Sequence, residues 1–313
     1  MEKTQFFRDS LRIIFMGTPE FAVASLDALM KAGFNIIAVI TAPDKPAGRG
    51  MQLTETAVKK YAVAHRLKTL TPEKLKAPSF LDELQSLNAD LQVVVAFRML
   101  PELVWNMPPM GTINLHASLL PQYRGAAPIN WAVINGEKET GVTTFKLKQE
   151  IDTGDILLQE SFLIGEDETA SDIHDRMKDI GAALLVKTVQ GLSAGSLSEM
   201  PQDKQEPLHH APKIFTETCK IDWNKPVNEI YNLIRGLSPY PTAFTYLNDK
   251  MLKVYKSQKL LTTPLSEPGN METDNKTFIR FSGIDGYIVL KEIQLEGKKK
   301  MLSEDFLRGY RFE

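Results

Sequence analysis

Two polar side chains that could act on a carbonyl group lie two residues apart near the end of a short apolar run. Asn114 and His116 stand at the end of a predicted strand over 111–115, so both should face the same side. A carboxylate, Asp152, follows in the tight turn 151–155. An amide can donate to an oxyanion, an imidazole can donate or relay protons, and a carboxylate can hold an imidazole protonated. This set favours acyl transfer to a substrate amine, which needs no Ser or Cys nucleophile.

The same residues also have a purely structural interpretation. A lone His after a strand is more often hydrogen-bonded within the fold than catalytic, and Asn at a strand end is a common turn residue. Asp-Thr-Gly-Asp at 152–155 makes a good β-turn without any chemistry. The remaining histidines have no comparable setting, and we assign them to the surface or to the fold: His65, His174, His209 and His210.

Hydrophobic periodicity predicts the strands and helices that carry these side chains. Short β-branched runs predict strands over 11–16, 34–41, 91–97, 111–115, 141–147 and 156–164. Amphipathic stretches predict helices over 19–31, 55–66, 79–87, 127–135 and 168–192. Alternating strands and helices predict an α/β fold with a largely parallel sheet that is covered on both faces. Ligands of such sheets bind outside the carboxyl ends of the strands, where Asn114 and His116 are expected.

The first strand-to-helix turn resembles a nucleotide-binding turn only in part. Met16-Gly17-Thr18-Pro19 lacks two of the three glycines of the dinucleotide fingerprint, and Pro19 removes a backbone N–H that would hold a pyrophosphate. No phosphate-binding loop of the G-x-x-x-x-G-K-[ST] type is present. A dinucleotide or nucleoside triphosphate function is therefore disfavoured.

Composition narrows the class of protein further. A chain of 313 residues suggests about two domains, and 43% hydrophobic residues are typical of a globular protein. The single cysteine, Cys219, excludes a disulfide framework and a Cys-rich zinc site. The apolar runs are far shorter than the ~18 residues of a membrane span, and residues 1–10 do not form a secretory or transit signal. We expect a cytoplasmic protein without a membrane partner.

The C-terminal third differs in pattern and charge. The polar, proline-containing segment 201–213 predicts a linker between domains at 1–200 and 214–313. A helix over 225–236 and short strands over 243–247, 251–256, 277–281 and 287–295 favour a small β-barrel or sandwich. The net charge of 211–313 is +3, in a chain with −2 overall. That could bind a polyanion weakly, although from this number alone an ordinary solvated surface is the better explanation.

A longer motif surrounds the candidate catalytic residues. Asn-Leu-His-Ala-Ser-Leu-Leu-Pro-Gln-Tyr-Arg-Gly at 114–125, followed by Ile-Asp-Thr-Gly-Asp at 151–155, resembles the formyltransferases that use 10-formyltetrahydrofolate. The resemblance implies a Rossmann-like formyltransferase domain followed by a small OB-like β-barrel. It also implies 10-formyltetrahydrofolate as co-substrate, no metal, and Asn114, His116 and Asp152 as the catalytic trio. The residues implied to line the folate site are Ser118, Leu119, Leu120 and Pro121.

Three further segments are similar to the family members that act on a charged tRNA: the basic loop 41–50, residues 125–129, and a C-terminal part with Ile-Asp-Trp at 221–223 and Pro-Tyr-Pro at 239–241. This similarity implies transfer of the formyl group to the α-amine of methionyl-tRNA (initiator), for translation initiation. Lys45 and Arg49 would then contact the tRNA. No oligomer is implied.

One segment departs from the family pattern, and other functions stay open. Ala-Phe-Arg-Met-Leu-Pro at 96–101 is one residue shorter than usual, which places the exact pterin contacts in doubt. A formyltransferase for a small amine is one alternative. The type that acts on glycinamide ribonucleotide is normally one domain, which 313 residues contradict, and a type that acts on an amino sugar nucleotide would fit the trio but not the basic loop as readily. An RNA-binding protein without enzyme activity would not need the trio. A folate-hydrolysing enzyme would be expected to carry a regulatory domain before Leu11.

Overall fold

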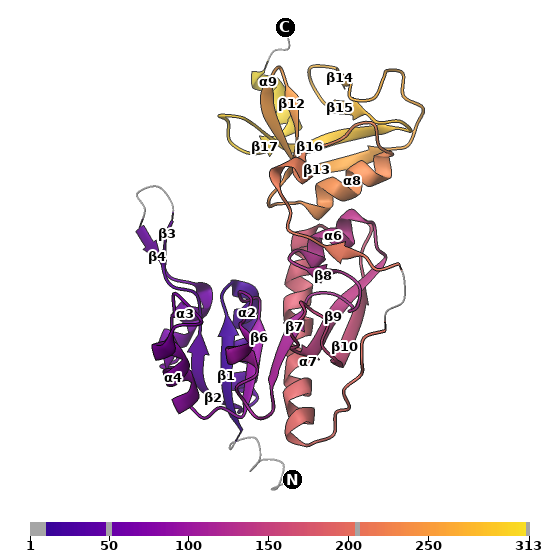
Figure 1. The fold of residues 1–313 in the computed structure, drawn as a ribbon. Helices are drawn as coiled ribbons and strands as arrows, with labels where there is room; N and C mark the ends of the chain where they lie inside the picture. Colours follow the sequence, from indigo (N-terminus) through magenta and orange to yellow (C-terminus); the bar gives the residue numbers. More distant parts are fainter. Residues whose placement is uncertain (1–10, 48–51, 204–206, 311–313) are drawn as a thin grey trace. The chain divides into compact units, whose positions relative to one another are not determined.

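The computed structural model describes residues 11–47, 52–203 and 207–310 (Figure 1). The chain divides into two compact units. Unit 1 comprises 1–124, 141–162 and 174–209, and unit 2 comprises 125–140, 163–173 and 210–313. The chain therefore passes between the units several times, and the predicted domain boundaries around 201–213 stay a prediction.

Unit 1 is built on a seven-stranded sheet in the order β10-β9-β7-β6-β1-β2-β5 (Figure 1). Five neighbouring strands run parallel, and β9 is antiparallel to β7. The largely parallel sheet of the predicted α/β fold is confirmed. Its strands are β1 (Arg12–Gly17), β2 (Asn35–Ile40), β5 (Thr69–Leu70), β6 (Leu91–Val95), β7 (Thr112–His116), β9 (Glu139–Lys146) and β10 (Ile156–Leu163).

Helices cover this sheet because each has one apolar side. Phe80 and Leu84 of α4 and Val104 of α5 pack on Met16 and Val94 of the sheet. Helix α7 lies on the other face, where its Gly181 lies against Leu115 of β7 and leaves little room for a side chain. The helices that contribute to this unit are α2 (Glu20–Lys31), α3 (Ala57–Ala64), α4 (Pro78–Ser86), α5 (Glu102–Trp105) and most of α7 (Ala170–Ser193). An antiparallel hairpin, β3 (Lys45–Ala47) and β4 (Gln52–Thr54), extends from the sheet.

Unit 2 contains a curled antiparallel sheet of six strands, which confirms the predicted small β-barrel as a half-barrel. Two register shifts in β13, between Val254 and Ser257, bend the strand as β-bulges do. Ile230 and Ile234 of α8 pack into the core formed by this sheet. The elements are β8 (Arg124–Gly125, at the boundary between the units), α6 (Pro128–Ile134), β11 (His210–Ala211), a 3₁₀ helix (Thr216–Cys219), α8 (Val227–Gly236), β12 (Ala243–Leu247), β13 (Lys250–Leu260), β14 (Met271–Thr273), β15 (Ile279–Ser282), β16 (Tyr287–Leu295), β17 (Met301–Leu302) and α9 (Ser303–Gly309).

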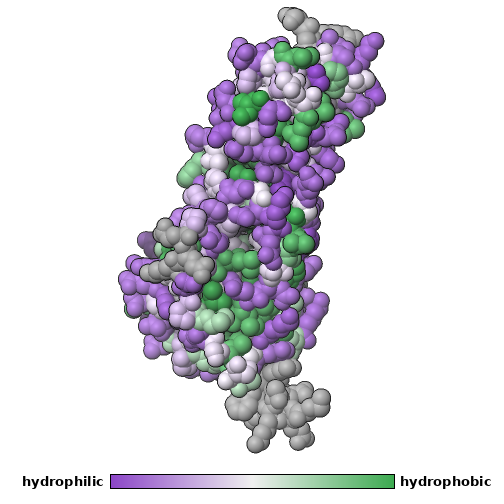
Figure 2. Space-filling view, turned by 90° about the vertical axis from the view of Figure 1, so that its right-hand side faces the viewer, coloured by the Kyte–Doolittle hydropathy of each residue, from purple (hydrophilic) through white to green (hydrophobic). Residues whose placement is uncertain are grey.

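Figure 2 shows hydrophilic side chains over most of one face, with hydrophobic side chains in smaller groups. Among the described residues, no helix combines the length and apolar character needed to cross a membrane.

Candidate active site

Asn114 and His116 lie at the carboxyl end of β7, on the face of the sheet opposite to α7. Asn114 is paired with Val94 of β6 in the sheet register, and Leu115 between them faces α7. The period of two in a strand therefore places both polar side chains on one side, as the sequence predicts. Asn114 is half-buried, and its side-chain amide makes no hydrogen bond with any residue that the structure describes. It is free to donate to a substrate oxygen.

The His116 imidazole is buried, and both of its nitrogens face a polar group. Nδ1 lies 3.8 Å from Oδ2 of Asp152, an ion-pair distance. Nε2 lies 2.9 Å from the carbonyl oxygen of Tyr123, and since a carbonyl only accepts, Nε2 carries a hydrogen and donates it. The edge of the ring also meets Phe145, with centroids 6.4 Å apart. The structure thus brings His116 and Asp152 together across 36 residues of sequence.

Asp152 sits in a tight turn between β9 and β10. Its φ of +55° lies in the left-handed region, which costs a residue with a Cβ about 1–2 kcal/mol. Two residues on, a Cβ at Gly154 would overlap the carbonyl oxygen of Lys146, so only glycine fits the turn. The carbonyl oxygens of Asp152 and Gly154 both accept hydrogen bonds from Nε2 of Gln202, at 2.8 and 2.7 Å. Sequence reasoning missed Gln202, which lies in the predicted linker.

The loop after β7 holds the four residues implied to bind folate. Ser118 and Leu120 are buried: the Ser118 hydroxyl donates to the carbonyl of Gln122 at 2.6 Å, and Leu120 packs in a small apolar cluster. Leu119 and Pro121 are half-buried, and the bond between Leu120 and Pro121 is cis. Leu119 and Pro121 are therefore the members of this set whose side chains can reach a ligand, while Ser118 and Leu120 shape the loop.

The segment that departs from the family pattern is anchored within unit 1. The Arg98 guanidinium donates to the carbonyl oxygens of Glu73, at 2.8 Å, and of Pro72. It also lies over the ring of Phe97, 5.6 Å from its centroid. Burial lowers the pKa of Arg98. Arg98 thus ties the end of β6 to the loop before α4.

Of the two residues implied to contact tRNA, the structure describes Lys45. Lys45 begins β3 and is exposed. Arg49 lies outside the described residues. The hairpin is held at its base, where Asp44 forms an ion pair with Lys59 at 2.6 Å.

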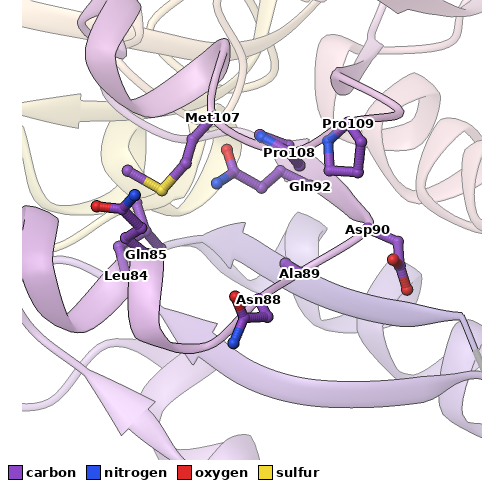
Figure 3. A pocket seen from close by; sticks show the side chains of 9 residues that line it. All are labelled: Leu84, Gln85, Asn88, Ala89, Asp90, Gln92, Met107, Pro108 and Pro109. Atoms are coloured by element: carbon purple, nitrogen blue, oxygen red, sulfur yellow. The ribbon is translucent and has the colours of Figure 1, made fainter.

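A pocket of about 320 Å³ opens at the opposite, amino edge of the same sheet (Figure 3). Three of its four polar side chains, those of Asn88, Asp90 and Gln92, have partners in the fold. Oε1 of Gln92 accepts from the Thr112 hydroxyl at 3.0 Å, and Oδ2 of Asp90 accepts from the backbone N–H of Arg12 at 2.8 Å. In the part of the chain that the structure describes, no group of three or more His, Cys, Asp or Glu side chains could hold a metal ion.

Comparison with known proteins gives a consistent result for both parts of the chain. Residues 11–189 match the family model for formyl transferase, and residues 213–311 match the model for the formyl transferase C-terminal domain. The methionyl-tRNA formyltransferase of Parabacteroides distasonis is 52% identical, covering 97% of each chain. That of Bacteroides fragilis is 49% identical, covering 97% of this chain and 96% of the relative.

Solved structures share the fold at lower identity. An N-formyltransferase from Helicobacter canadensis, in complex with folinic acid and dTDP-3-aminofucose, has a TM-score of 0.69 and 23% identity, covering 93% of this chain and 100% of that one. HypX from Aquifex aeolicus, in complex with tetrahydrofolic acid, has a TM-score of 0.64 and 17% identity. That match covers 95% of this chain and 47% of HypX.

Proposed function

The chain belongs to the formyl transferase family, and we propose that it transfers the formyl group of 10-formyltetrahydrofolate to the α-amine of methionyl-tRNA. The product is N-formylmethionyl-tRNA, which initiates translation. The observation that carries this proposal is the sequence identity of 49% and 52%, over 97% of this chain, to proteins named methionyl-tRNA formyltransferase. Both domains of the family are also present.

The reaction exchanges one C–N bond for another. The neutral α-amine attacks the formyl carbon, the new C–N bond forms, and the bond from that carbon to N10 of the folate breaks. One proton leaves the amine nitrogen, and one is delivered to N10. Negative charge develops on the formyl oxygen during the attack, and the Asn114 amide is the donor placed to stabilise it.

His116 and Asp152 serve the proton transfers. Oδ2 of Asp152 lies 3.8 Å from Nδ1 of His116, close enough to orient the ring. Nε2 of His116 donates its hydrogen to the carbonyl oxygen of Tyr123. A substrate atom that accepts this hydrogen must therefore displace the Tyr123 carbonyl. The family motif and these contacts support the proposed roles of the trio.

Binding of the two substrates is assigned to different surfaces. The half-buried Leu119 and Pro121 supply apolar contact for the folate, within the loop 118–121. Lys45 and Arg49 of the basic loop engage the acceptor end of the charged initiator tRNA, and the +3 charge of 211–313 adds phosphate contacts. Because the product is used in translation, we place the protein in the cytoplasm.

The test of this function is direct. Purified protein is mixed with 10-formyltetrahydrofolate and methionine-charged initiator or elongator tRNA, and N-formylmethionine is measured after deacylation. We expect formylation of the initiator tRNA. Formylation of an amino sugar nucleotide without any product from methionyl-tRNA would overturn the proposal.

A further inference from the structure

The Gln202 side chain joins two parts of the candidate active site that are far apart in sequence. Its Nε2 donates to the carbonyl oxygens of Asp152 and Gly154, at 2.8 and 2.7 Å. Its Oε1 accepts from Nε and Nη2 of Arg124, at 3.1 and 2.6 Å. Arg124 ends the loop that begins at His116. One amide therefore links the loop after β7 to the turn that carries Asp152.

The polarity of these partners requires an amide. A guanidinium only donates hydrogen bonds and a carbonyl only accepts them, so the group between them must accept at one end and donate twice at the other. A carboxylate would satisfy Arg124 but repel both carbonyls, and an ammonium would do the reverse. The partners also fix which end of the Gln202 amide is oxygen.

The turn that accepts these hydrogen bonds has an unfavourable backbone conformation at Asp152. Asp152 is held at a positive φ, a conformation that persists when surrounding contacts fix it. The chain segment that carries Gln202 is itself anchored, because Met200 and Ile156 exchange backbone hydrogen bonds of 2.9 and 2.7 Å. Gln202 thus connects the turn to a fixed support in unit 1.

We propose that Gln202 is a positioning residue for the formyl transfer, which holds the Asp152 carboxylate at Nδ1 of His116. Arg124 orients the Gln202 amide. The inference rests on the proposed function, and it assigns a role in the site to a residue of the segment 201–213, which the sequence indicates only as a linker.

The first test removes the hydrogen bonds and keeps the length of the side chain. Gln202→Met should lower kcat about 10- to 100-fold, the usual cost of losing a group that orients a reacting side chain. KM for the folate and for methionyl-tRNA should stay near the wild-type values, because the hydrogen bonds of the Gln202 amide all go to groups of the protein. The matched control is Gln85→Met, which makes the same change at an exposed residue of α4 and should leave kcat unchanged.

The second test asks whether Gln202 acts through Asp152. In a double-mutant cycle, Gln202→Met should have little further effect on kcat once Asp152→Ala is present, because the group it positions is gone. A merely structural Gln202 would lower kcat by the same factor in both backgrounds. Gln202→Glu, which keeps the Arg124 contact, should lose activity as Gln202→Met does.

A readout independent of turnover completes the design. NMR resonances of the His116 ring, assigned with the His116→Gln variant, should move in Gln202→Met in the same direction as in Asp152→Asn. Circular dichroism verifies that each variant is folded. An inactive wild-type protein would refute the proposed function, and the ring resonances would still test the positioning. An active wild type with unchanged kcat and unchanged ring resonances in Gln202→Met would overturn the inference.

Discussion

The two edges of the sheet in unit 1 use polar groups in opposite ways. At the amino edge, beside the pocket of Figure 3, Arg12 donates to the carbonyls of Asn88 and Leu87 at 3.0 and 2.8 Å, and Asp90 accepts from the Arg12 backbone. At the carboxyl edge, the Asn114 amide has no partner among the described residues. Most polar groups at the amino edge are therefore satisfied by the fold, whereas the side-chain amide of Asn114 at the carboxyl edge is available.

Backbone conformation separates the same two edges. At the amino edge, positive φ values occur at Gly33, Arg66, Asn88 and Gly111, and of these only Arg66 is a residue type that adopts the region at a marked cost. At the carboxyl edge they occur at Ala96, Tyr123 and Asp152, all of which carry a Cβ and adopt the region at a cost, which is smallest for Asp. Strain and an unpaired donor therefore occur together, where open α/β sheets bind ligands. A hollow alone, such as the pocket at the amino edge, is weaker evidence of function.

The largest effect is expected from His116→Ala. Loss of the imidazole removes the proton-transfer group, and kcat should fall roughly 10²- to 10⁴-fold. The fold should persist, and circular dichroism and the urea midpoint of unfolding would verify this. Turnover near that of the wild type would show that the carboxyl edge does not perform the chemistry through this ring.

Asn114→Ala should follow, with a fall in kcat of about 10²- to 10³-fold for the loss of one donor to the formyl oxygen. KM should change little, because the donor matters most where charge develops. Steady-state kinetics with both substrates varied separate the two constants. An effect confined to KM would mean that Asn114 only binds substrate.

Arg12→Ala tests the amino edge. The variant loses two hydrogen bonds of an exposed guanidinium, so the free energy of unfolding should fall by about 1 kcal/mol. Urea denaturation measures this change, and kcat per folded molecule should equal the wild-type value. A fall in kcat comparable to that of Asn114→Ala would remove the distinction between the edges.

The smallest effect is expected from Ala89→Leu, which projects a larger apolar side chain at the pocket of the amino edge. The free energy of unfolding should change by no more than roughly 0.5 kcal/mol. Both kcat and KM should stay within about two-fold of the wild-type values. A marked rise in KM for either substrate would instead make this pocket a binding site.

Sequence reasoning reached the parts of the fold that carry long periodic signals. The parallel strands β1, β2, β6 and β7 and the helices α2, α7 and α8 were predictable from apolar spacing. That Asn114 and His116 face the same side was predictable from the period of a strand. The elements β5, α5 and the hairpin β3–β4 are too short for a period to register. The roles of the trio came from the family motif, since spacing alone left a structural interpretation open.

The remaining parts of the site have no signal in the sequence. The Tyr123 carbonyl that accepts from His116 is a backbone group, which every residue carries. Gln202 stands in a polar segment with several prolines, and only the three-dimensional path of the chain brings it to Asp152. Contacts of this kind depend on tertiary structure, so local pattern could not predict them.

Within unit 2, helix α6 packs against helix α8, which is synthesised much later. Nδ2 of Asn130 donates to the carbonyl of Gly236 at 2.7 Å, across 106 residues of sequence, and Ile134 packs against the core that includes α8. At a synthesis rate of about 5–20 residues per second, α6 leaves the ribosome roughly 5–20 s before α8 is available. During that interval the apolar side of α6 lacks this cover, so the nascent chain must remain soluble until its C-terminal third emerges.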